Sequence, residues 1–231
     1  MTRRLIVNAD DLGLSHGVNA GIAKAHDDGI VTSASLMVRQ PAAEAAATWA
    51  RDRPDLSLGL HLDLCEWRPC GRSWGPAYER CPLDDVDCVA TETDAQLGLF
   101  GELVGRPPTH VDSHQHVHRR PAVCAVVAER AARLGVPLRE CSDVGYVGGF
   151  YGQDARGRAW PDLLTAEALL GILDGLGPGW SELGCHPGFA EDTGSTYRDE
   201  RRREVDVLCD TAVRTWLDGA GIELATFGTE R

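Results

Sequence analysis

Short aliphatic and β-branched runs alternate along the chain with longer stretches in which apolar residues recur every three or four positions. The short runs predict strands at residues 5–8, 31–38, 56–62, 109–114, 137–141, 181–185 and 222–227. The longer stretches predict helices at residues 17–26, 42–51, 94–104, 121–134, 163–176 and 198–219. Strands that alternate with helices are typical of parallel β/α units. We therefore expect an α/β fold, a single irregular (β/α) barrel of about seven strands that resembles a TIM barrel.

Two segments follow neither period. Residues 63–83 and 142–162 contain Trp, Pro and Gly residues and read as irregular loops. Loops of this length are uncommon in compact domains unless they serve a function. No linker rich in Pro, Gly and Ser divides the chain, so we expect residues 1–231 to form one domain.

Composition and charge narrow the class of partner. The chain has 231 residues, 43% of them hydrophobic, and a formal net charge of −12. A nucleic-acid partner is not expected, because phosphate backbones are bound by clustered Lys and Arg. Residues 1–7 meet the polar residues 8–11 too early for a signal peptide, and no apolar run is long enough to span a membrane. We expect a cytoplasmic protein with no membrane partner and a neutral or cationic small substrate, and a homo-oligomer is left open.

Eight cysteines are scattered without any C-x-x-C pair. In a cytosolic chain of this size, reduced thiols that serve as small hydrophobic residues are expected. Four of the cysteines are possible exceptions, because they fall in or next to an irregular segment and could pair or bind a metal: Cys65, Cys70, Cys81 and Cys88.

Polar residues gather where predicted strands end. Asp10 and Asp11 follow the first strand, and His61 closes the third. His114 lies at the end of the fourth strand, and His186 follows a later one. In a parallel barrel the carboxyl ends of the strands converge at one mouth, so these residues can share one site.

The paired carboxylates of Asp10 and Asp11 would point in opposite directions if the strand stayed extended there. One carboxylate could then bind a metal while its neighbour faces substrate. The alternative is that one of them caps the next helix or forms an Asx turn.

The densest polar segment runs from residue 109 to residue 118. If it stays extended, Asp112, His114, His116 and His118 share one face, because strand side chains alternate. Imidazole is the commonest metal ligand in proteins, so this face predicts a metal site, with a solvated strand end as the alternative. The spacing does not decide which of the three histidines binds.

Two single histidines give weaker signals. His61 lies in an apolar strand, where a hydrogen-bonded core histidine is the alternative. His186 precedes a Pro-Gly turn. Such turns often present catalytic groups, and the alternative is that this segment is only a turn. His16 and His26 read as surface residues.

Several motifs follow one another in order along nearly the full chain. The first lies in the segment from residue 5 to residue 38, which contains Asn8-Ala9-Asp10-Asp11-Leu12-Gly13. The others are Gly59-Leu60-His61, the segment 109–118, Phe150-Tyr151-Gly152, Cys185-His186-Pro187 and Glu204-Val205-Asp206-Val207-Leu208. Together they resemble the motifs of the YdjC-like carbohydrate deacetylases. Leu12 departs from the family's usual aromatic residue, and the segment after His61 is shorter than in the chitooligosaccharide deacetylases.

The resemblance implies a site and an activity. A divalent metal ion, Zn²⁺ or Mg²⁺, would be held by Asp11, His61 and His114, with Asp10 as the general base. Imidazole ligands favour zinc or another transition metal. The implied activity is metal-dependent N-deacetylation of an acetylated amino sugar, which is hydrolysis of a C–N bond other than a peptide bond.

The remaining polar and aromatic candidates receive supporting roles. His186 is the candidate general acid, with His116 in reserve. Asp112 and His118 are candidates for orienting the metal ligands. Aromatic side chains in the irregular segments could stack on sugar or pack in the core; they are Trp67, Trp74, Phe150 and Tyr151.

Two other functions remain open on sequence alone. A metal-dependent phosphoesterase would need a basic pocket, for which residues 119–120 and 201–203 are the available arginine clusters. The second cluster reads more simply as the solvated face of a charged helix. A non-catalytic sugar-binding protein would follow if Asp10 could not reach the metal-bound water.

Overall fold

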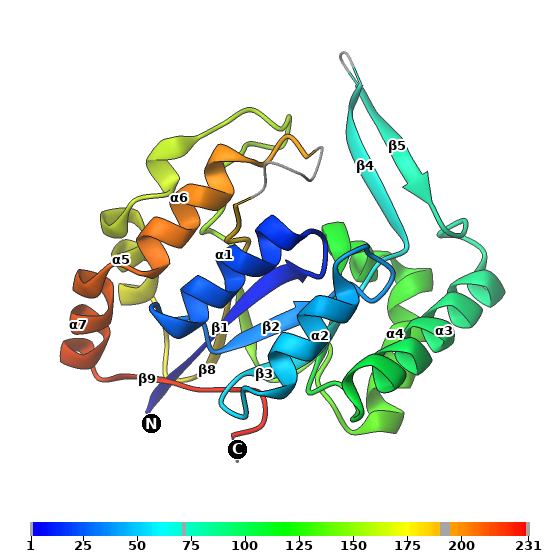
Figure 1. Cartoon of the computed structure of the whole chain (residues 1–231), viewed down its shortest axis with the longest axis horizontal. Helices are drawn as coiled ribbons and strands as arrows, with labels where there is room; N and C mark the ends of the chain where they lie inside the picture. Colours follow the sequence, from blue (N-terminus) through cyan, green and yellow to red (C-terminus); the bar gives the residue numbers. More distant parts are fainter. Residues whose placement is uncertain (1, 71–72, 190–194, 230–231) are drawn as a thin grey trace.

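The computed structural model describes residues 2–70, 73–189 and 195–229. Strands and helices alternate along much of the chain (Figure 1). The strands are β1 Arg3–Leu12, β2 Ser33–Leu36, β3 Ser57–Leu62, β4 Cys65–Cys70, β5 Ser73–Glu79, β6 Val111–Ser113, β7 Gly145–Val147, β8 Gly179–Cys185 and β9 Ile222–Leu224. The α-helices are α1 His16–Asp27, α2 Ala43–Arg51, α3 Val86–Val104, α4 Pro121–Leu134, α5 Ala166–Asp174, α6 Asp199–Leu208 and α7 Thr211–Ala220. Two 3₁₀ segments, η1 His114–Arg119 and η2 Pro161–Leu163, complete the set.

Seven strands form one parallel sheet in the order β6-β3-β2-β1-β8-β7, with β9 also paired to β1. Strand β9 pairs with the first residues of β1, and β2 pairs with its later residues. The sheet curls into a partial barrel, and helices α1 to α4 lie around it (Figure 1). The expected α/β barrel architecture is therefore confirmed, with β6 and β7 as the two ends of the strand order in the described part of the chain.

Strand β1 separates two environments. Leu5, Val7 and Ala9 are fully buried in the large core that includes the helices. Ile6 points the other way and packs in a small cluster with Val144, Ala225 and Phe227 inside the curl of the sheet. Because side chains alternate along a strand, Asn8 and Asp10 continue the inner face toward the carboxyl end. The inner face of β1 therefore changes from apolar to polar as it approaches the mouth of the barrel.

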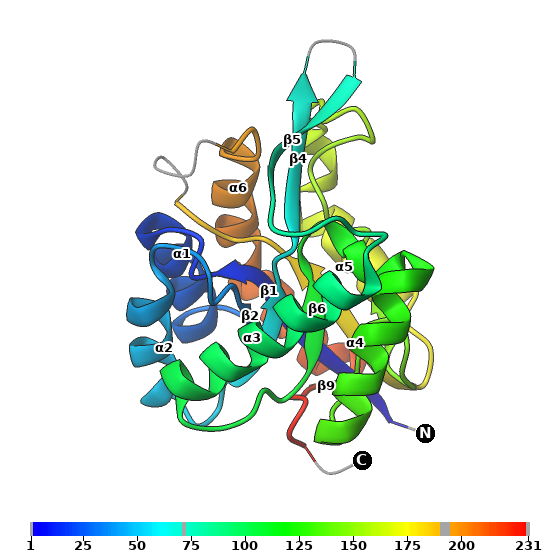
Figure 2. The ribbon, with the colours of Figure 1, turned by 90° about the vertical axis from the view of Figure 1, so that its right-hand side faces the viewer.

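Contrary to expectation, most of the described part of the segment 63–83 forms two regular strands. Strands β4 and β5 pair antiparallel as a separate two-stranded sheet. This hairpin projects away from the parallel sheet in both views (Figures 1 and 2). At its base, Tyr78 donates a hydrogen bond to the buried carboxylate of Asp63 at 2.7 Å, and Arg80 forms an ion pair with the same carboxylate at 2.7 Å.

Several other boundaries differ from the predicted ones. The helix expected at 198–219 is two helices, because Asp210 lies between them and its side chain accepts a hydrogen bond from the Ala212 N–H at the start of α7. Helix α3 begins at Val86, where Asp85 provides the N-cap. The strand expected at 137–141 is reduced to one bridge between Val111 and Leu138. The irregular segment 142–162 contains the short strand β7.

All eight cysteines are free. No disulfide forms among Cys65, Cys70, Cys81 and Cys88, and none of them belongs to a group of described residues that could hold a metal ion. Within the described residues, no helix is both long enough and apolar enough to cross a membrane.

Candidate active site

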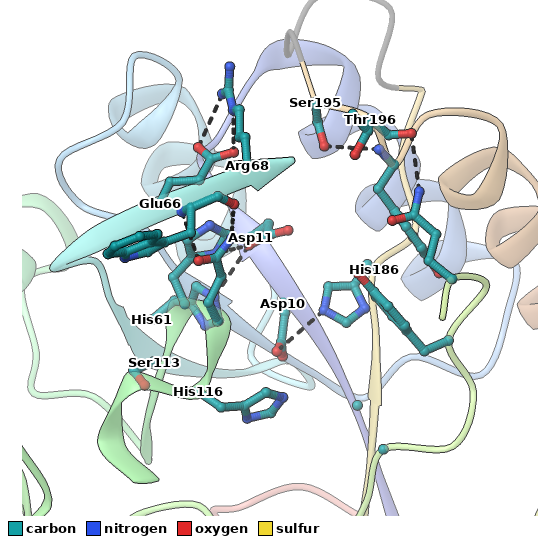
Figure 3. A pocket seen from close by; sticks show the side chains of 18 of the residues that line it. Asp10, Asp11, His61, Glu66, Arg68, Ser113, His116, His186, Ser195 and Thr196 are labelled. Atoms are coloured by element: carbon teal, nitrogen blue, oxygen red, sulfur yellow. Dashed lines mark hydrogen bonds and ion pairs between the residues drawn. The ribbon is translucent and has the colours of Figure 1, made fainter. Parts of the chain in front are cut away.

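A cavity of about 360 Å³ opens at the carboxyl ends of the parallel strands (Figure 3). The structure brings six of the predicted polar residues to its walls: Asp10, Asp11, His61, His114, His116 and His186. They come from β1, from β3, from η1 after β6 and from the end of β8. The hairpin adds Glu66 to Pro69 and Trp74 to the lining, and Ser195, Thr196 and Tyr197 also belong to it. Ser195 and Thr196 lie across the cavity from Glu66 and Arg68 (Figure 3). Convergence of strand ends, expected from the sequence, is thus what forms the cavity.

The two adjacent carboxylates face the same cavity, not opposite directions. Asp11 has a φ of 66°, in the left-handed region, and the pairing of β1 with β2 shifts register between Ala9 and Leu12. The chain therefore leaves the extended conformation at Asp11, and the alternation on which the expectation rested no longer applies. A non-glycine residue with positive φ is uncommon, and such residues concentrate at functional sites.

Asp11, His61 and His114 form a candidate metal centre. The Asp11 Oδ1 atom lies 3.3 Å from His61 Nε2 and 3.0 Å from His114 Nδ1. Ligands at ordinary Zn–N and Zn–O lengths of roughly 2.0–2.2 Å lie about 3–3.5 Å apart, so these separations fit one ion. His61 Nδ1 bonds to Asp112 Oδ1 at 2.7 Å, which fixes the ring with Nε2 toward Asp11. A carboxylate behind a ligating histidine is the usual outer support of a metal site.

The electrostatics of this group favour a cation. Burial opposes protonation of His61, but the nearby carboxylates, Asp112 first among them, outweigh it and raise its pKa well above the ordinary value. The same negative field attracts a divalent ion. A second group with suitable ligand atoms is His116, His118 and Glu140. There the Arg119 guanidinium bonds both oxygens of the Glu140 carboxylate, at 2.7 and 2.9 Å, so neither oxygen is left for an ion.

The histidine segment does not continue as a strand, so its members do not share one face. Strand β6 ends at Ser113, and η1 turns with positive φ at Gln115 (51°) and His116 (53°). Asp112 supports His61 inside the barrel, and His114 joins Asp11. His116 lines the cavity. His118 bonds to Ser113 Oγ at 2.6 Å and to Glu140, away from the candidate metal centre.

Asp10 is held by an arginine that sequence reasoning missed. Arg139 donates to both Asp10 oxygens at 2.7 Å and is itself fully buried. Burial would raise the pKa of Asp10, but the Arg139 charge and hydrogen bonds outweigh it and hold this pKa well below its usual range. Asn8 donates a further hydrogen bond at 2.8 Å. Asp10 is therefore ionised and fixed in orientation.

Arg139 joins two more carboxylates inside the barrel. It forms ion pairs with Asp112 at 2.8 Å and with Glu182 at 2.6 Å. The signal for it in the sequence is an arginine within the short segment predicted as a strand at 137–141. Charged side chains are almost never buried unless they are paired, so that position could have suggested an internal ion pair.

His186 faces Asp10 across the cavity. Its Nε2 atom lies 3.8 Å from Asp10 Oδ2, and its backbone N–H donates to the buried Glu204 carboxylate. Tyr151 and Tyr197 contact the imidazole edge to face, with ring centroids 5.3 and 5.8 Å away. Burial lowers the pKa of His186 to about 4, so the ring is neutral at pH 7.

Arg201 does not belong to a solvated helix face. It is only 3% exposed and forms an ion pair with Asp11 Oδ2 at 2.5 Å, on the side away from the two histidines. The prediction that residues 201–203 form a solvated helix face is thus wrong for Arg201. The charged helix α6 turns Arg201 and Glu204 inward, where carboxylates, amides and tyrosine hydroxyls provide partners.

The four aromatic candidates separate by burial. Trp67, Trp74 and Tyr151 line the cavity, and Trp74 is 44% exposed. Phe150 is fully buried in the large core, so the core alternative holds for this residue. Tyr197 and Tyr146, which the sequence did not single out, also line the cavity.

The fold and the cavity define a β/α-barrel protein in which a candidate metal centre lies beside a carboxylate held by a buried arginine. Residues 4–219 match the family model described as YdjC-like protein, and the chain therefore belongs to the YdjC-like family. A relative from Geobacillus stearothermophilus named carbohydrate deacetylase is 35% identical, with 98% of each chain covered. A relative from Enterobacter sp. named chitooligosaccharide deacetylase is also 35% identical, covering 98% of this chain and 99% of its own.

Solved structures share the fold. A protein from Enterococcus faecalis, named for cellobiose-phosphate cleavage, has a TM-score of 0.80 at 27% identity, with 98% of each chain covered. A family 4 carbohydrate esterase from Streptomyces lividans has a TM-score of 0.56 at 12% identity, covering 97% of this chain and 92% of its own. The second likeness concerns the fold alone.

Proposed function

We propose that this protein is a metal-dependent hydrolase that removes the N-acetyl group from an acetylated amino sugar or a glycoside that carries one. The observation that carries the proposal is that two adjacent carboxylates, Asp10 and Asp11, line one cavity but have different binding partners. Asp11 lies 3.3 Å and 3.0 Å from the imidazoles of His61 and His114, whereas both Asp10 oxygens are bound by Arg139. The relatives named carbohydrate and chitooligosaccharide deacetylase support a sugar amide as substrate.

Asp11, His61 and His114 would hold the ion. Two imidazoles and one carboxylate are a donor set typical of catalytic zinc. When bound, such an ion lowers the pKa of a coordinated water and polarises the acetamide carbonyl. The Arg201 ion pair holds the second oxygen of Asp11, so that Oδ1 is directed toward the imidazoles.

Asp10 is the proposed general base. Asp10 is ionised at neutral pH, which is the state that can accept a proton from the attacking water. The two bonds from Arg139 fix the plane of the carboxylate, so the base is oriented before substrate arrives. Arg139 acts through Asp10 and is a positioning residue.

His186 is the proposed donor to the departing nitrogen. Because burial keeps its imidazole neutral in the free protein, it must gain a proton during the reaction. Asp10, 3.8 Å away, carries one after it has deprotonated the water. Transfer from Asp10 through His186 to the amine would restore the Asp10 carboxylate and give the free amine and acetate. His116 lines the same cavity and stays in reserve for this role.

The cavity offers less to a phosphate group. Three arginines line it among the described residues, and each is paired with a carboxylate: Arg68 with Glu66, Arg119 with Glu140 and Arg201 with Asp11. A phosphate monoester would have to displace one of these partners. We therefore favour an uncharged acetylated sugar over a phosphoester.

The test is acetate release by protein of known metal content. The protein is stripped with a chelator, reloaded with Zn²⁺ or Mg²⁺, and incubated with N-acetylated sugars, glycolipid head groups and aminoglycoside derivatives. We expect stoichiometric metal, acetate release from at least one sugar, and loss of activity after chelation. Full activity with metal far below stoichiometry would contradict the metal mechanism, and sugar binding without acetate release would favour a binding protein.

A further inference from the structure

The projecting hairpin is attached to the candidate metal centre through one side chain. Gln115 directly follows His114, and its amide bonds to both backbone groups of Trp67 in β4. The Trp67 N–H donates to Gln115 Oε1 at 2.9 Å, and Gln115 Nε2 donates to the Trp67 carbonyl at 2.8 Å. Both bonds are within the normal range for strong N–H···O hydrogen bonds.

These two bonds reproduce strand pairing. In an antiparallel pair the N–H and C=O of one residue point to the same side. Trp67 is opposite Pro76, which has no N–H, and directs both of its backbone groups to Gln115. The carboxamide of Gln115 has a donor and an acceptor side by side and can therefore serve both groups at once. Gln115 thus covers the outer edge of β4, which would otherwise present unpaired backbone groups.

The backbone at Gln115 makes this reach possible. Its φ of 51° belongs to the left-handed turn that starts η1, immediately after the strand that ends at Ser113. The turn places His114 at Asp11 and the next side chain at the hairpin. One short segment therefore contacts the candidate metal centre and β4 together.

The part of the hairpin that Gln115 holds is a wall of the cavity. Glu66 and Arg68 lie above Asp11 and His61, and Ser195 and Thr196 lie across from them (Figure 3). Farther out, Pro69 meets the turn at Gly157, where an added Cβ would lie 3.2 Å from Pro69 Cγ. A sugar whose acetyl group reaches Asp11 must extend outward between these walls.

We propose that Gln115 is a positioning residue that fixes the β4–β5 hairpin relative to the candidate metal centre, so that the hairpin contacts the sugar unit beyond the acetylated one. This inference rests on the proposed deacetylase function. In this proposal the hairpin determines which substrate length is preferred. That preference then depends on Gln115, the residue next to the proposed metal ligand His114. The asparagine and glutamine amides elsewhere in the chain make no such contact with β4 in the described residues.

The experiment compares Gln115→Met and Gln115→Glu with the wild type. Methionine keeps the length of the side chain and removes both hydrogen bonds, whereas glutamate keeps the acceptor and places a carboxylate against the Trp67 carbonyl. Gln153→Met is the matched control for the hairpin measurement, because Gln153 lines the cavity but bonds to Thr196 and Glu200 rather than to β4. Each protein is measured for metal content, hydrogen exchange of β4, and kcat and KM with N-acetylglucosamine and N,N′-diacetylchitobiose.

We expect hydrogen exchange in β4 to rise roughly tenfold in Gln115→Met, because both hydrogen bonds are lost. The rise should be smaller in Gln115→Glu, where the Trp67 N–H keeps an acceptor, and exchange should be unchanged in Gln153→Met. Metal content should stay stoichiometric. KM for the disaccharide should rise about tenfold with kcat within about twofold, while KM for the monosaccharide changes little.

Unchanged exchange in Gln115→Met would overturn the attachment itself. An equal rise in KM for both sugars, or no rise for either, would overturn the link to the second sugar unit. If the wild type releases acetate from no sugar, the proposed function fails, and the exchange comparison still decides whether Gln115 holds the hairpin.

Discussion

Asp10 and Asp11 are adjacent in sequence, yet their carboxylates have different partners. Asp11 contacts His61 and His114, whereas Asp10 contacts Arg139 and Asn8. Residue type alone does not distinguish them. The positive φ at Asp11 does, because it turns one of two consecutive side chains out of the strand pattern.

Asp10→Asn and His114→Ala should therefore fail in different ways. Asp10→Asn keeps the shape of the side chain and loses the base, so metal content should be near normal while kcat falls roughly 10²–10⁴-fold. His114→Ala removes a ligand, so bound metal and activity should fall together and excess metal should restore part of both. Elemental analysis and acetate release on the same preparations check this. Loss of metal from Asp10→Asn, with Asp11→Asn retaining it, would reverse the two roles.

Arg139→Met tests the buried ion network. The substitution leaves Asp10, Asp112 and Glu182 without their shared cation inside the barrel. Removing one partner of a buried ion pair typically costs about 3–5 kcal/mol of unfolding free energy. Arg130→Met is the matched control, because Arg130 pairs with the half-exposed Asp94 at the surface, and about 1 kcal/mol or less is expected there. Equal losses in urea denaturation would show that the network contributes no more than a surface pair.

At the scale of elements, helix α1 and the turn after β8 pack at a glycine–glycine contact. A Cβ on Gly21 would lie 2.3 Å from Gly188 Cα, and the Phe189 N–H donates to the Gly17 carbonyl at 2.9 Å. Gly188 is two residues after His186. The helix therefore helps to set the position of the candidate general acid.

Gly21→Ala should push this turn away from α1. We expect a loss of about 1–3 kcal/mol of unfolding free energy from overpacking, together with a lower kcat because His186 moves. Gly98→Ala in α3 is the control: no atom lies within 4 Å of its added Cβ, so a gain of about 0.5–1 kcal/mol from helix propensity is expected. Thermal unfolding and acetate release are measured for both variants. If Gly21→Ala is destabilised but keeps the wild-type kcat, the glycine–glycine contact does not influence catalysis.

The elements that the sequence predicted well are those with a long regular period. Helices α1, α2 and α4 lie within two residues of their expected ends. The β4–β5 hairpin was missed, because its prolines and exposed positions hide the alternation that marks a strand. The 198–219 helix was predicted unbroken, because a single capping Asp210 gives little signal inside a periodic stretch.

At the scale of the whole molecule, buried neutral histidines should make the fold sensitive to acid. His110 is 1% exposed, stacks on Phe227 at 3.9 Å and has its pKa lowered to about 4 by burial. Its pKa in the unfolded chain is about 6.5. A group with a depressed folded pKa contributes stability that is present above pH 6.5 and is lost as the pH falls toward 4.

His110→Leu should flatten this dependence. Between pH 7.5 and pH 5 the wild type should lose about 2 kcal/mol more unfolding free energy than the variant, whatever the offset between them at pH 7.5. Urea denaturation at the two pH values measures the difference. Parallel losses in the two proteins would mean that His110 does not remain neutral in the fold at pH 5.

The sequence by itself determined the alternation of strands and helices and the placement of Asp10, Asp11, His61 and His114 at strand ends. Both follow from local patterns, since side-chain period and strand limits are written in neighbouring residues. The tertiary structure decided the partners: Arg139 is 129 positions from Asp10, and Arg201 is 190 positions from Asp11. It also decided, through the left-handed turn at residues 115 and 116, that only one of three neighbouring histidines meets Asp11. Contacts of this kind depend on how distant strands align and where the chain turns, and no local period encodes them.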